Sequence, residues 1–251
     1  TKGLPVALAT IIEGPGQGAK LLLLPDGSYL GSLGNEKINN VLSRDMAGEL
    51  AAGRTSIRHY GIEGEAREET LSIFIESFAP PPQMVIFGAV DFTAALVRIA
   101  KVLGYKVIVC DARPVFATTA RFPQADAVEN EWPDQLMEKL GASLGPRDAV
   151  CVLTHDNKFD VPAITSALQT QVGYIGVMGS RKTHENRTER LIEAGVTTKE
   201  FERVMSPIGL DLGARTPEET AISICAEIIA MRTGRKAPHL KTIEGAIHGD
   251  R

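Results

Sequence analysis

The stretch "MVIFGAVDFTAALVRIAKVLGYKVIVCD", residues 84–111, decides the fold class expected for this chain. It reads as an apolar strand over 84–89, a helical pattern over 91–104 and a second apolar strand over 105–111. Strands that are apolar on both faces are typical of parallel sheets covered by helices on each side. The stretch therefore predicts a strand-helix-strand unit of a parallel sheet.

Two further apolar runs extend this pattern: "AVCVLT" (149–154) and "VGYIGVMGS" (172–180), each followed by a helical segment. We therefore expect an α/β protein in which residues 83–251 form a Rossmann-like, mostly parallel, doubly wound sheet. Ligands of such sheets bind beyond the carboxyl ends of the strands. The positions at this edge are Gly88, Asp111, residues 154–156 and residues 179–182.

A separate, small α/β domain is predicted over residues 1–79. Three prolines follow it in "APPPQ" (79–83), and they can continue neither a helix nor a central strand. The expected elements are a strand (5–12), a strand pair with a turn at Asp26 and Gly27 (20–33), a helix (35–53) and two strands (55–61, 70–78).

Composition limits the class of function. The chain of 251 residues is 43% hydrophobic, and its net charge is -4 without a basic cluster, so no nucleic-acid partner and no membrane surface are expected. No apolar run approaches the roughly 20 residues that span a bilayer, and no leader pattern is seen, so a cytoplasmic protein is expected. The three cysteines are widely spaced and are predicted to be reduced, inert thiols without a metal site.

The segment "FGAVDFT" stands where a dinucleotide-binding fold has its glycine-rich turn. Gly88 matches the first glycine, but Val90 and Thr93 occupy the other two positions. The second glycine lets a pyrophosphate approach the backbone, so NAD(P) is the less favoured cofactor, although helix-start amides can still hold a phosphate. Asp111 follows about 20 residues later, where a carboxylate binds ribose hydroxyls. A solvated loop aspartate is the equal alternative.

The segment "LTHDNKFD" places His155 and Asp156 just past the strand over 149–154. A histidine beside a carboxylate can move protons or bind a polar ring. Neighbouring side chains on an extended chain point apart, so a helix cap is the alternative for one of them. We expect one of the two to face the ligand.

The segment "YIGVMGSRKT" (174–183) predicts an anion-binding turn. Gly179 allows a close backbone approach, Ser180 is a suitable N-cap, and Arg181 and Lys182 begin the next helix. Cations at the positive end of a helix are locally unfavourable, by roughly 0.3–1 kcal/mol each, unless an anion compensates them. Side chains that extend into water are the alternative, and the anion-binding interpretation is preferred.

The segment "SPIGLDLGARTPEETAISICAEIIAMRTG" (206–234) predicts a loop followed by a long helix. Thr216, Pro217 and Glu219 have the spacing of a capping box with proline at the first helical position, and Gly234 ends the helix. Apolar residues of the helix, Ile222 and Ile229 among them, are expected in the core. In the loop, Asp211 and Arg215 either contact a ligand or pair with each other.

These segments, together with "CDARPVFA" (110–117) and "RFPQAD" (121–126), resemble the XdhC/CoxI family of xanthine dehydrogenase accessory proteins. The resemblance covers about residues 85–234, and the N-terminal region is similar in layout. It implies a maturation factor that binds molybdenum cofactor as cargo, assists its sulfuration and inserts it into a molybdenum hydroxylase. A cysteine desulfurase and a second copy of the chain are further implied partners.

The chain departs from the family pattern at Val90 and Asp91, and it lacks the N-terminal cysteine. Three hypotheses therefore stay open. The leading one is a cofactor-binding maturation factor that is not an enzyme. The others are a nucleotide-dependent oxidoreductase or transferase that uses the Rossmann crevice, and a degenerate regulatory protein that binds the cofactor.

Overall fold

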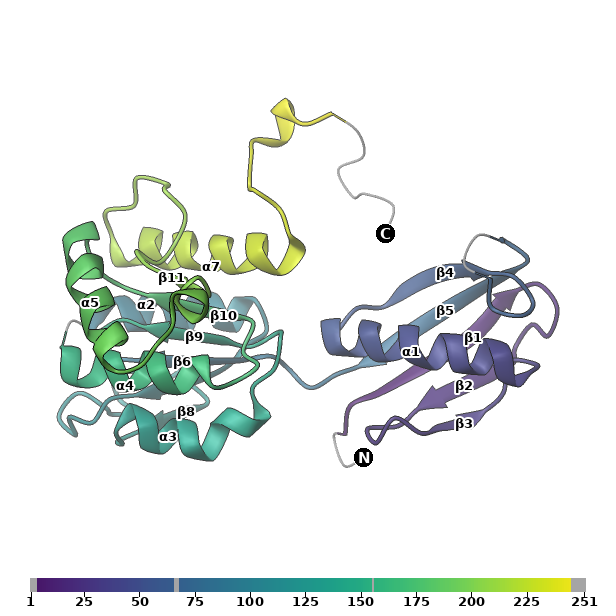
Figure 1. Ribbon diagram of the computed structural model, residues 1–251, viewed down its shortest axis with the longest axis horizontal. Coiled ribbons are helices and arrows are strands. Elements are labelled where there is room, and N and C mark those ends of the chain that lie inside the picture. Colours follow the sequence, from purple (N-terminus) through teal and green to yellow (C-terminus); the bar gives the residue numbers. More distant parts are fainter. Residues whose placement is uncertain (1–3, 66–67, 155, 245–251) are drawn as a thin grey trace. The chain divides into compact units, whose positions relative to one another are not determined.

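The computed structural model describes residues 4–65, 68–154 and 156–244 (Figure 1). The chain divides into two compact units, Thr1–Pro81 and Pro82–Arg251. The three consecutive prolines at positions 80–82 lie where one unit gives way to the other. Each unit has its own hydrophobic core, so each is described by itself.

The N-terminal unit is a five-stranded antiparallel sheet with one helix. Its strands lie in the order β3-β2-β1-β5-β4. The expected turn joins β2 to β3, and Gly27 within it has a φ of 82°. The elements are β1 (Val6–Glu13), β2 (Lys20–Leu23), β3 (Tyr29–Gly31), α1 (Glu36–Ala52), β4 (Ser56–Tyr60) and β5 (Leu71–Phe78).

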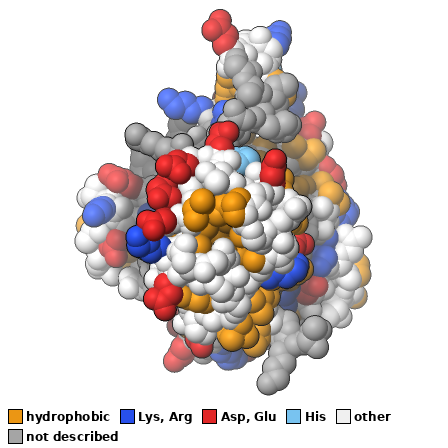
Figure 2. Space-filling view, turned by 90° about the vertical axis from the view of Figure 1, so that its right-hand side faces the viewer, with side chains coloured by type: hydrophobic (Ala, Val, Ile, Leu, Met, Phe, Trp, Pro, Cys, Tyr) orange, Lys and Arg blue, Asp and Glu red, His pale blue; other side chains and the backbone are white. Residues whose placement is uncertain are grey.

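Helix α1 packs on one face of this sheet. Asn35 caps its start by accepting hydrogen bonds from the amides of Lys37 (2.9 Å) and Ile38 (3.1 Å), and Gly53 ends it with a φ of 62°. Alternate residues of the strands meet the helix in the core. Figure 2 looks onto one end of this unit and shows hydrophobic side chains gathered beside acidic ones. The unit's exposed large hydrophobic residues are Leu4, Ile12, Leu30, Ile57, Ile62 and Phe78.

The C-terminal unit is built on a six-stranded sheet in which every neighbouring pair is parallel. The order is β11-β10-β9-β6-β7-β8. Counted from β6 and read from β8, this is the 3-2-1-4-5-6 order of the Rossmann fold. The strands are β6 (Gln83–Phe87), β7 (Lys106–Cys110), β8 (Ala127–Glu129), β9 (Ala149–Val152), β10 (Tyr174–Val177) and β11 (Val204–Met205).

Helices cover both faces of this sheet, which confirms the predicted fold class. Leu96 of α2 and Ile224 of α7 share one core with Ile86, whereas Ile164 of α4 shares the other with Val85. Helices α3 and α5 contribute to that second core. The helices are α2 (Asp91–Val102), α3 (Pro133–Leu140), α4 (Asn157–Leu168), α5 (Arg181–Glu193), α6 (Thr198–Phe201) and α7 (Pro217–Thr233), with short 3₁₀ turns at Gly141–Ser143 and Leu240–Thr242.

Helix α7 has the ends that the sequence predicts. The Thr216 hydroxyl accepts a hydrogen bond from the Glu219 amide at 3.2 Å, the Glu219 carboxylate accepts one from the Thr216 amide at 3.1 Å, and Gly234 has a φ of 65°. The expectation for Ile222 and Ile229 is wrong, because α7 packs by one face and leaves them 50% and 38% exposed. Over the ranges that the structure describes, no helix is long and apolar enough to cross a membrane.

Candidate functional site

The carboxyl ends of the parallel strands form the edge where a ligand is expected. From the central pair β6 and β9, the chain winds toward β7 on one side and toward β10 on the other, and a crevice forms at such a reversal point. Gly88, after β6, has a φ of 107°, and a Cβ atom there would lie 3.0 Å from the amide nitrogen of Thr154. Glycine therefore lets the ends of β6 and β9 approach each other.

The loop between β6 and α2 uses its polar groups internally. The Ala89 amide donates to Asp111 Oδ2 at 2.8 Å, and the Val90 amide donates to Thr93 Oγ1 at 3.4 Å. Asp91, in the first turn of α2, has an exposed carboxylate. Two occupied amides before the helix and a negative side chain in its first turn make this loop a poor seat for a pyrophosphate.

Asp111 directly follows β7, and its carboxylate is 3% exposed. Its Oδ1 accepts from the amide (3.0 Å) and Nε (2.9 Å) of Arg113, and its Oδ2 accepts from Arg113 Nη2 (2.8 Å) as well as from Ala89. Burial raises the pKa of Asp111, but the hydrogen bonds from Arg113 and Ala89 outweigh burial and lower that pKa below its ordinary value. A solvated loop aspartate is therefore not what the structure shows, and a contact with ribose stays a prediction.

The variant Asp111→Asn is expected to lose stability at neutral pH. A carboxyl group whose pKa is lowered by folding stabilises the protein at pH values above its unfolded-state pKa of about 3.9. This stabilisation is lost as the pH falls through the lower pKa of the folded state. The difference in melting temperature between wild type and variant should be widest near about pH 7 and should shrink below about pH 4. Melting curves measured across this range test it. Asp134→Asn, at an exposed position, is the control, and a pH-independent difference for Asp111→Asn would contradict the role of the charge.

The segment after β9 has a structural role at two described positions. Asp156 is the N-cap of α4, and its side chain accepts a hydrogen bond from the Lys158 amide at 3.0 Å. Of the two roles considered for Asp156, the structure thus shows the helix cap. Thr154 is buried, and its hydroxyl donates to Asp160 Oδ1 at 2.5 Å. His155 lies outside the described residues, so its ligand-facing role stays a prediction.

The turn between β10 and α5 has the cap geometry that its sequence predicts. Ser180 is extended (φ -77°, ψ 166°), and its side chain accepts from the Thr183 amide at 3.1 Å. Lys182 is exposed in the first turn of α5. The first amides of a helix have no acceptor within the helix, and the positive end of the helix dipole lies there. The turn therefore offers donors to an anion; the Arg181 side chain lies outside the described residues.

Beneath this turn is a buried ion pair that the sequence did not predict. Arg187 of α5 and Asp160 of α4 are each 1% exposed, with Arg187 Nη2 2.8 Å from Asp160 Oδ2. Nη2 also donates to the Met178 carbonyl at 2.9 Å, and Nη1 donates to Ser206 Oγ at 3.3 Å. Because Asp160 also binds Thr154, one network joins the segments that follow β9, β10 and β11.

Gly179 brings the backbone of the turn against this network. A Cβ atom on Gly179 would lie 3.4 Å from both terminal nitrogens of Arg187 and 3.3 Å from Thr183 Cβ. The missing side chain therefore lets the turn before α5 lie close to the guanidinium group.

The loop between β11 and α7 is fixed at its start. The Gly209 amide donates to Glu227 Oε2 at 2.9 Å, and the Ser223 hydroxyl donates to the Leu210 carbonyl at 2.5 Å. Gly209 has a φ of 97°, and a Cβ atom there would lie 2.5 Å from Ser223 Oγ. The same Glu227 oxygen accepts from the Tyr174 hydroxyl at 2.5 Å. The beginning of the loop is thus held to α7 and β10.

Farther along this loop, Asp211 and Arg215 are exposed. Among the residues that the structure describes, no ion pair joins Asp211 to Arg215, so the predicted alternative that they pair with each other is not observed. The Arg215 amide donates to Glu219 Oε2 at 2.7 Å, which fixes its backbone. Both charged side chains extend from the loop that follows β11.

The three thiols are all buried. Burial raises the pKa of Cys110 to about 12 and that of Cys225 to about 12, and it raises the pKa of Cys151 well above its ordinary value. The thiolate is the form that attacks sulfur and binds metals. The thiols are therefore protonated at neutral pH and shielded from solvent.

Five aromatic and arginine residues that the sequence did not single out form a continuous series at the carboxyl edge beyond β7 and β8. The ring centroids of Trp132 and Phe159 are 5.0 Å apart. The Arg113 guanidinium lies 5.9 Å from the Phe159 centroid and 4.5 Å from the Phe116 centroid, and the Arg121 guanidinium lies 5.5 Å from Phe116. We call these five residues the arginine-aromatic ladder. The segments "CDARPVFA" and "RFPQAD" contain three of its members, Arg113, Phe116 and Arg121.

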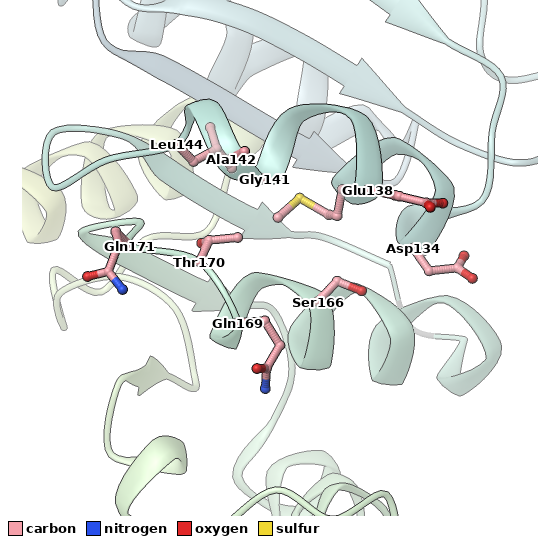
Figure 3. A pocket seen from close by; sticks show the side chains of 10 residues that line it. Asp134, Glu138, Gly141, Ala142, Leu144, Ser166, Gln169, Thr170 and Gln171 are labelled. Carbon is pink, nitrogen blue, oxygen red and sulfur yellow. The ribbon is translucent and has the colours of Figure 1, made fainter. Parts of the chain in front are cut away.

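A cavity of about 530 Å³ lies away from this edge, between α3 and α4 (Figure 3). Its lining includes Gly141 and Leu144, which precede β9, and Gln169 and Gln171, which precede β10. It therefore opens where the strands begin, whereas the predicted site residues follow the strands.

Family models match most of the chain. The XdhC Rossmann domain matches residues 84–228, and the XdhC and CoxI family matches residues 1–61. A Bacillus subtilis protein described as a probable xanthine dehydrogenase subunit is 36% identical over 165 residues, which are 66% of this chain and 47% of that protein. The molybdenum cofactor insertion chaperone PaoD of Escherichia coli is 25% identical over 162 residues, which are 64% of this chain and 44% of that one.

The chain thus spans about half the length of the curated relatives it matches. A crystal structure described as a xanthine dehydrogenase from Bacillus halodurans has the same fold, with a TM-score of 0.58, 23% identity and 94% of each chain covered. By the match to its Rossmann domain over residues 84–228, the chain belongs to the XdhC and CoxI family.

Proposed function

We propose that this protein binds molybdenum cofactor as cargo, protects it during sulfuration and assists its insertion into a molybdenum hydroxylase of the xanthine dehydrogenase type. The cargo is bound at the carboxyl edge of the parallel sheet. The chain binds and positions the cofactor, and the client enzyme is the protein in which the cofactor takes part in catalysis.

The turn at the start of α5 is the observation that supports this proposal most directly. The pterin of the cofactor carries a phosphate, and a helix N-terminus with a nearby cation is a favourable place for a phosphate. Ser180 caps the helix, Lys182 is exposed beside it, and the buried Arg187 lies under Gly179. The residues present therefore fit the anionic end of the cargo.

The names of two relatives support the same role. One name describes a probable component of xanthine dehydrogenase, and the other describes a molybdenum cofactor insertion chaperone. The alternative of a dinucleotide-dependent enzyme is less well supported, because the loop before α2 uses its amides on Asp111 and Thr93.

The buried thiols also bear on the source of sulfur. Since Cys110, Cys151 and Cys225 are protonated and shielded, we propose that a partner such as a cysteine desulfurase supplies the sulfur that the cofactor receives. Self-association of the chain stays a prediction.

Identification of the bound small molecule tests the proposed function. Protein purified from a host that makes molybdenum cofactor should contain a pterin, seen by mass spectrometry and by absorption spectroscopy. Loaded protein should also restore activity to a cofactor-free molybdenum hydroxylase. The control is protein from a host that cannot make the pterin, which should restore none.

Two results would count against the proposal. Bound NAD(P) in place of pterin would favour the oxidoreductase. Protein that is empty after purification and does not take up added molybdopterin would favour the degenerate regulatory protein.

A further inference from the structure

We propose that the outer face of helix α7, together with the segment that follows this helix, binds the same surface of a second copy of the chain. The two α7 helices pack antiparallel across a twofold axis that passes beside Ala226. This inference goes beyond the proposed function and does not depend on it, because its test uses protein without cargo.

Helix α7 carries apolar residues on every side. Ile224 and Ile228 lie in the core beneath the helix, whereas Ile222 is 50% exposed and Ile229 is 38% exposed. A surface helix normally opposes its apolar face with a charged one, and a helix that is apolar all round is typically covered all round. In the C-terminal unit, α7 lies on the outside of one face of the sheet (Figure 1). A further surface is therefore expected to cover it.

The outer residues of α7 form one stripe along the helix. Ile222, Ala226 and Ile229 follow the i, i+4, i+7 spacing that places side chains on one face. Ala226, in the middle of the stripe, is half-buried and has the smallest side chain of the three. The distance between two packed helices depends on the side chains at their crossing, and a small residue there lets them approach closely. The stripe therefore fits a second helix.

The charges at the ends of α7 favour a second copy in the antiparallel direction. Glu218 is 59% exposed in the first turn, and Arg232 is exposed in the last turn. With Ala226 of both copies at the crossing, Ile222 of one helix lies opposite Ile229 of the other. Glu218 of one helix then lies near Arg232 of the other, whereas a parallel pair would bring like charges together. The apolar and the charged residues thus both find partners on an identical surface, as a twofold interface requires.

The segment after α7 enlarges this surface. A helix of 17 residues is about 25 Å long and about 10 Å wide, so its outer face is smaller than the roughly 800 Å² that each partner of a stable complex buries. Residues 235–244 leave the end of α7 and are exposed throughout (Figure 1). We call them the C-terminal arm. The arm includes Leu240, which is 62% exposed, and Ile243, which is 43% exposed, so it offers further apolar area.

The antiparallel direction brings the C-terminal arm of one copy to the sheet edge of the other. Helix α7 begins after the loop that follows β11, so its start lies toward the carboxyl edge and its end lies away from it. The end of one α7 is therefore beside the start of the other. Leu212 in that loop is 56% exposed and can pack against Leu240. The exposed carboxylate of Asp211 next to it matches the exposed cations Arg235 and Lys236.

Sedimentation equilibrium of the full chain without cargo tests whether this interface forms. At micromolar concentration, the wild type should have twice the mass of one chain. Dilution should shift it toward the single chain, which gives the Kd of the dimer. An arm that folds back on its own α7 would instead leave a single chain at every concentration.

The variant Ile229→Glu should raise the Kd of the dimer at least about 100-fold, because each copy would then bury an uncompensated carboxylate in the interface. Ile192→Glu is the matched control. Ile192 is 61% exposed in α5, a helix that contributes to the core on the other face of the sheet, so this variant should keep the wild-type Kd. Circular dichroism shows whether each variant is folded.

Reversing the end charges tests the direction of the two helices. Glu218→Arg and Arg232→Glu should each weaken the dimer about 5- to 30-fold, because each places like charges together. The double variant exchanges the two charges and should regain most of the affinity. A parallel pair predicts no such recovery.

The variant Ala226→Cys tests the crossing point without disturbing the fold. A disulfide needs two Cα atoms within about 4.4–6.8 Å of each other, so mild oxidation should link the two copies at position 226. The three native thiols are buried and should not react. Ile192→Cys is the control and should stay unlinked.

Three results would overturn the proposal. The first is a wild-type chain that stays single up to millimolar concentration, and this result does not depend on the folding of any variant. The second is an equal dimer Kd for wild type and a folded Ile229→Glu, which would place the interface elsewhere. The third is Ala226→Cys that links no faster than Ile192→Cys. Uptake of molybdopterin is measured separately, so failure here leaves the proposed function untouched.

Discussion

Replacing Arg187 with methionine is expected to lower the free energy of unfolding of the C-terminal unit by about 3–5 kcal/mol. The substitution leaves the Asp160 carboxylate, 1% exposed, without its guanidinium partner. It also removes the donors to the Met178 carbonyl and to Ser206 Oγ. An uncompensated buried charge costs far more than the lost contact between two exposed charges.

Urea denaturation followed through Trp132, which lies in this unit, measures the loss. Arg98→Met is the control, because the Arg98–Glu218 pair is 51% and 59% exposed, and it should change the free energy of unfolding by no more than about 1 kcal/mol. The double variant Arg187→Met/Asp160→Leu should regain much of the stability, since no charge is left buried. A double variant as unstable as the single one would show that the ion pair is not the cause.

The double variant Arg181→Ala/Lys182→Ala is expected to weaken molybdopterin binding by about 2–4 kcal/mol, allowing for non-additivity of two charge-assisted hydrogen bonds. This corresponds to roughly 30- to 1,000-fold in Kd. The fold should not suffer, because removing cations from the positive end of a helix stabilises it slightly. Added salt should weaken wild-type binding, since exposed charges are screened.

Calorimetric titration with molybdopterin and thermal melts of both proteins test this expectation. Arg190→Ala/Lys199→Ala is the matched control, since it removes the same net charge from exposed positions in α5 and α6 and should leave the affinity unchanged. Equal affinity of the site variant and the wild type would mean that the two cations extend into water. Weaker binding accompanied by a lower melting temperature would mean that they stabilise the fold.

Local signals in the sequence predicted much of the fold. Thr216 and Ser180 both cap helices as expected, because a cap depends on residues within one turn of it. The long apolar runs became β6, β7, β9 and β10, because a strand buried on both faces is visible in the sequence alone.

Features that depend on distant partners were missed. Strands β8 and β11 have three and two residues, too few for a periodic pattern, and they exist because β7 and β10 offer them a parallel partner. Arg187 lies in a strongly polar helix, which is typical of a solvated surface. Its burial depends on Asp160, which is 27 residues away.

The ladder shows the same limit within the candidate site. Arg113, Phe116 and Arg121 lie in segments that resemble the family, but nothing local says that their side chains stack. Phe159 and Trp132 come from α4 and from the loop after β8, so only the folded sheet brings the five together. By contrast, the capped turn before α5 is formed by consecutive residues, so its geometry could be predicted from the sequence alone. Its binding of an anion stays a prediction.

The two separate cores have a thermodynamic consequence for any ligand of this protein. Residues 1–81 and 82–251 each bury their own apolar side chains, with three prolines at their junction. A ligand that binds only folded protein raises the stability of the cooperative unit that holds it, by an amount set by its concentration relative to Kd. A molecule bound wholly at the carboxyl edge of the parallel sheet will therefore raise the melting temperature of the C-terminal unit and leave that of the N-terminal unit unchanged. A molecule that shifts both transitions together either contacts both units or shows that the two units unfold as one.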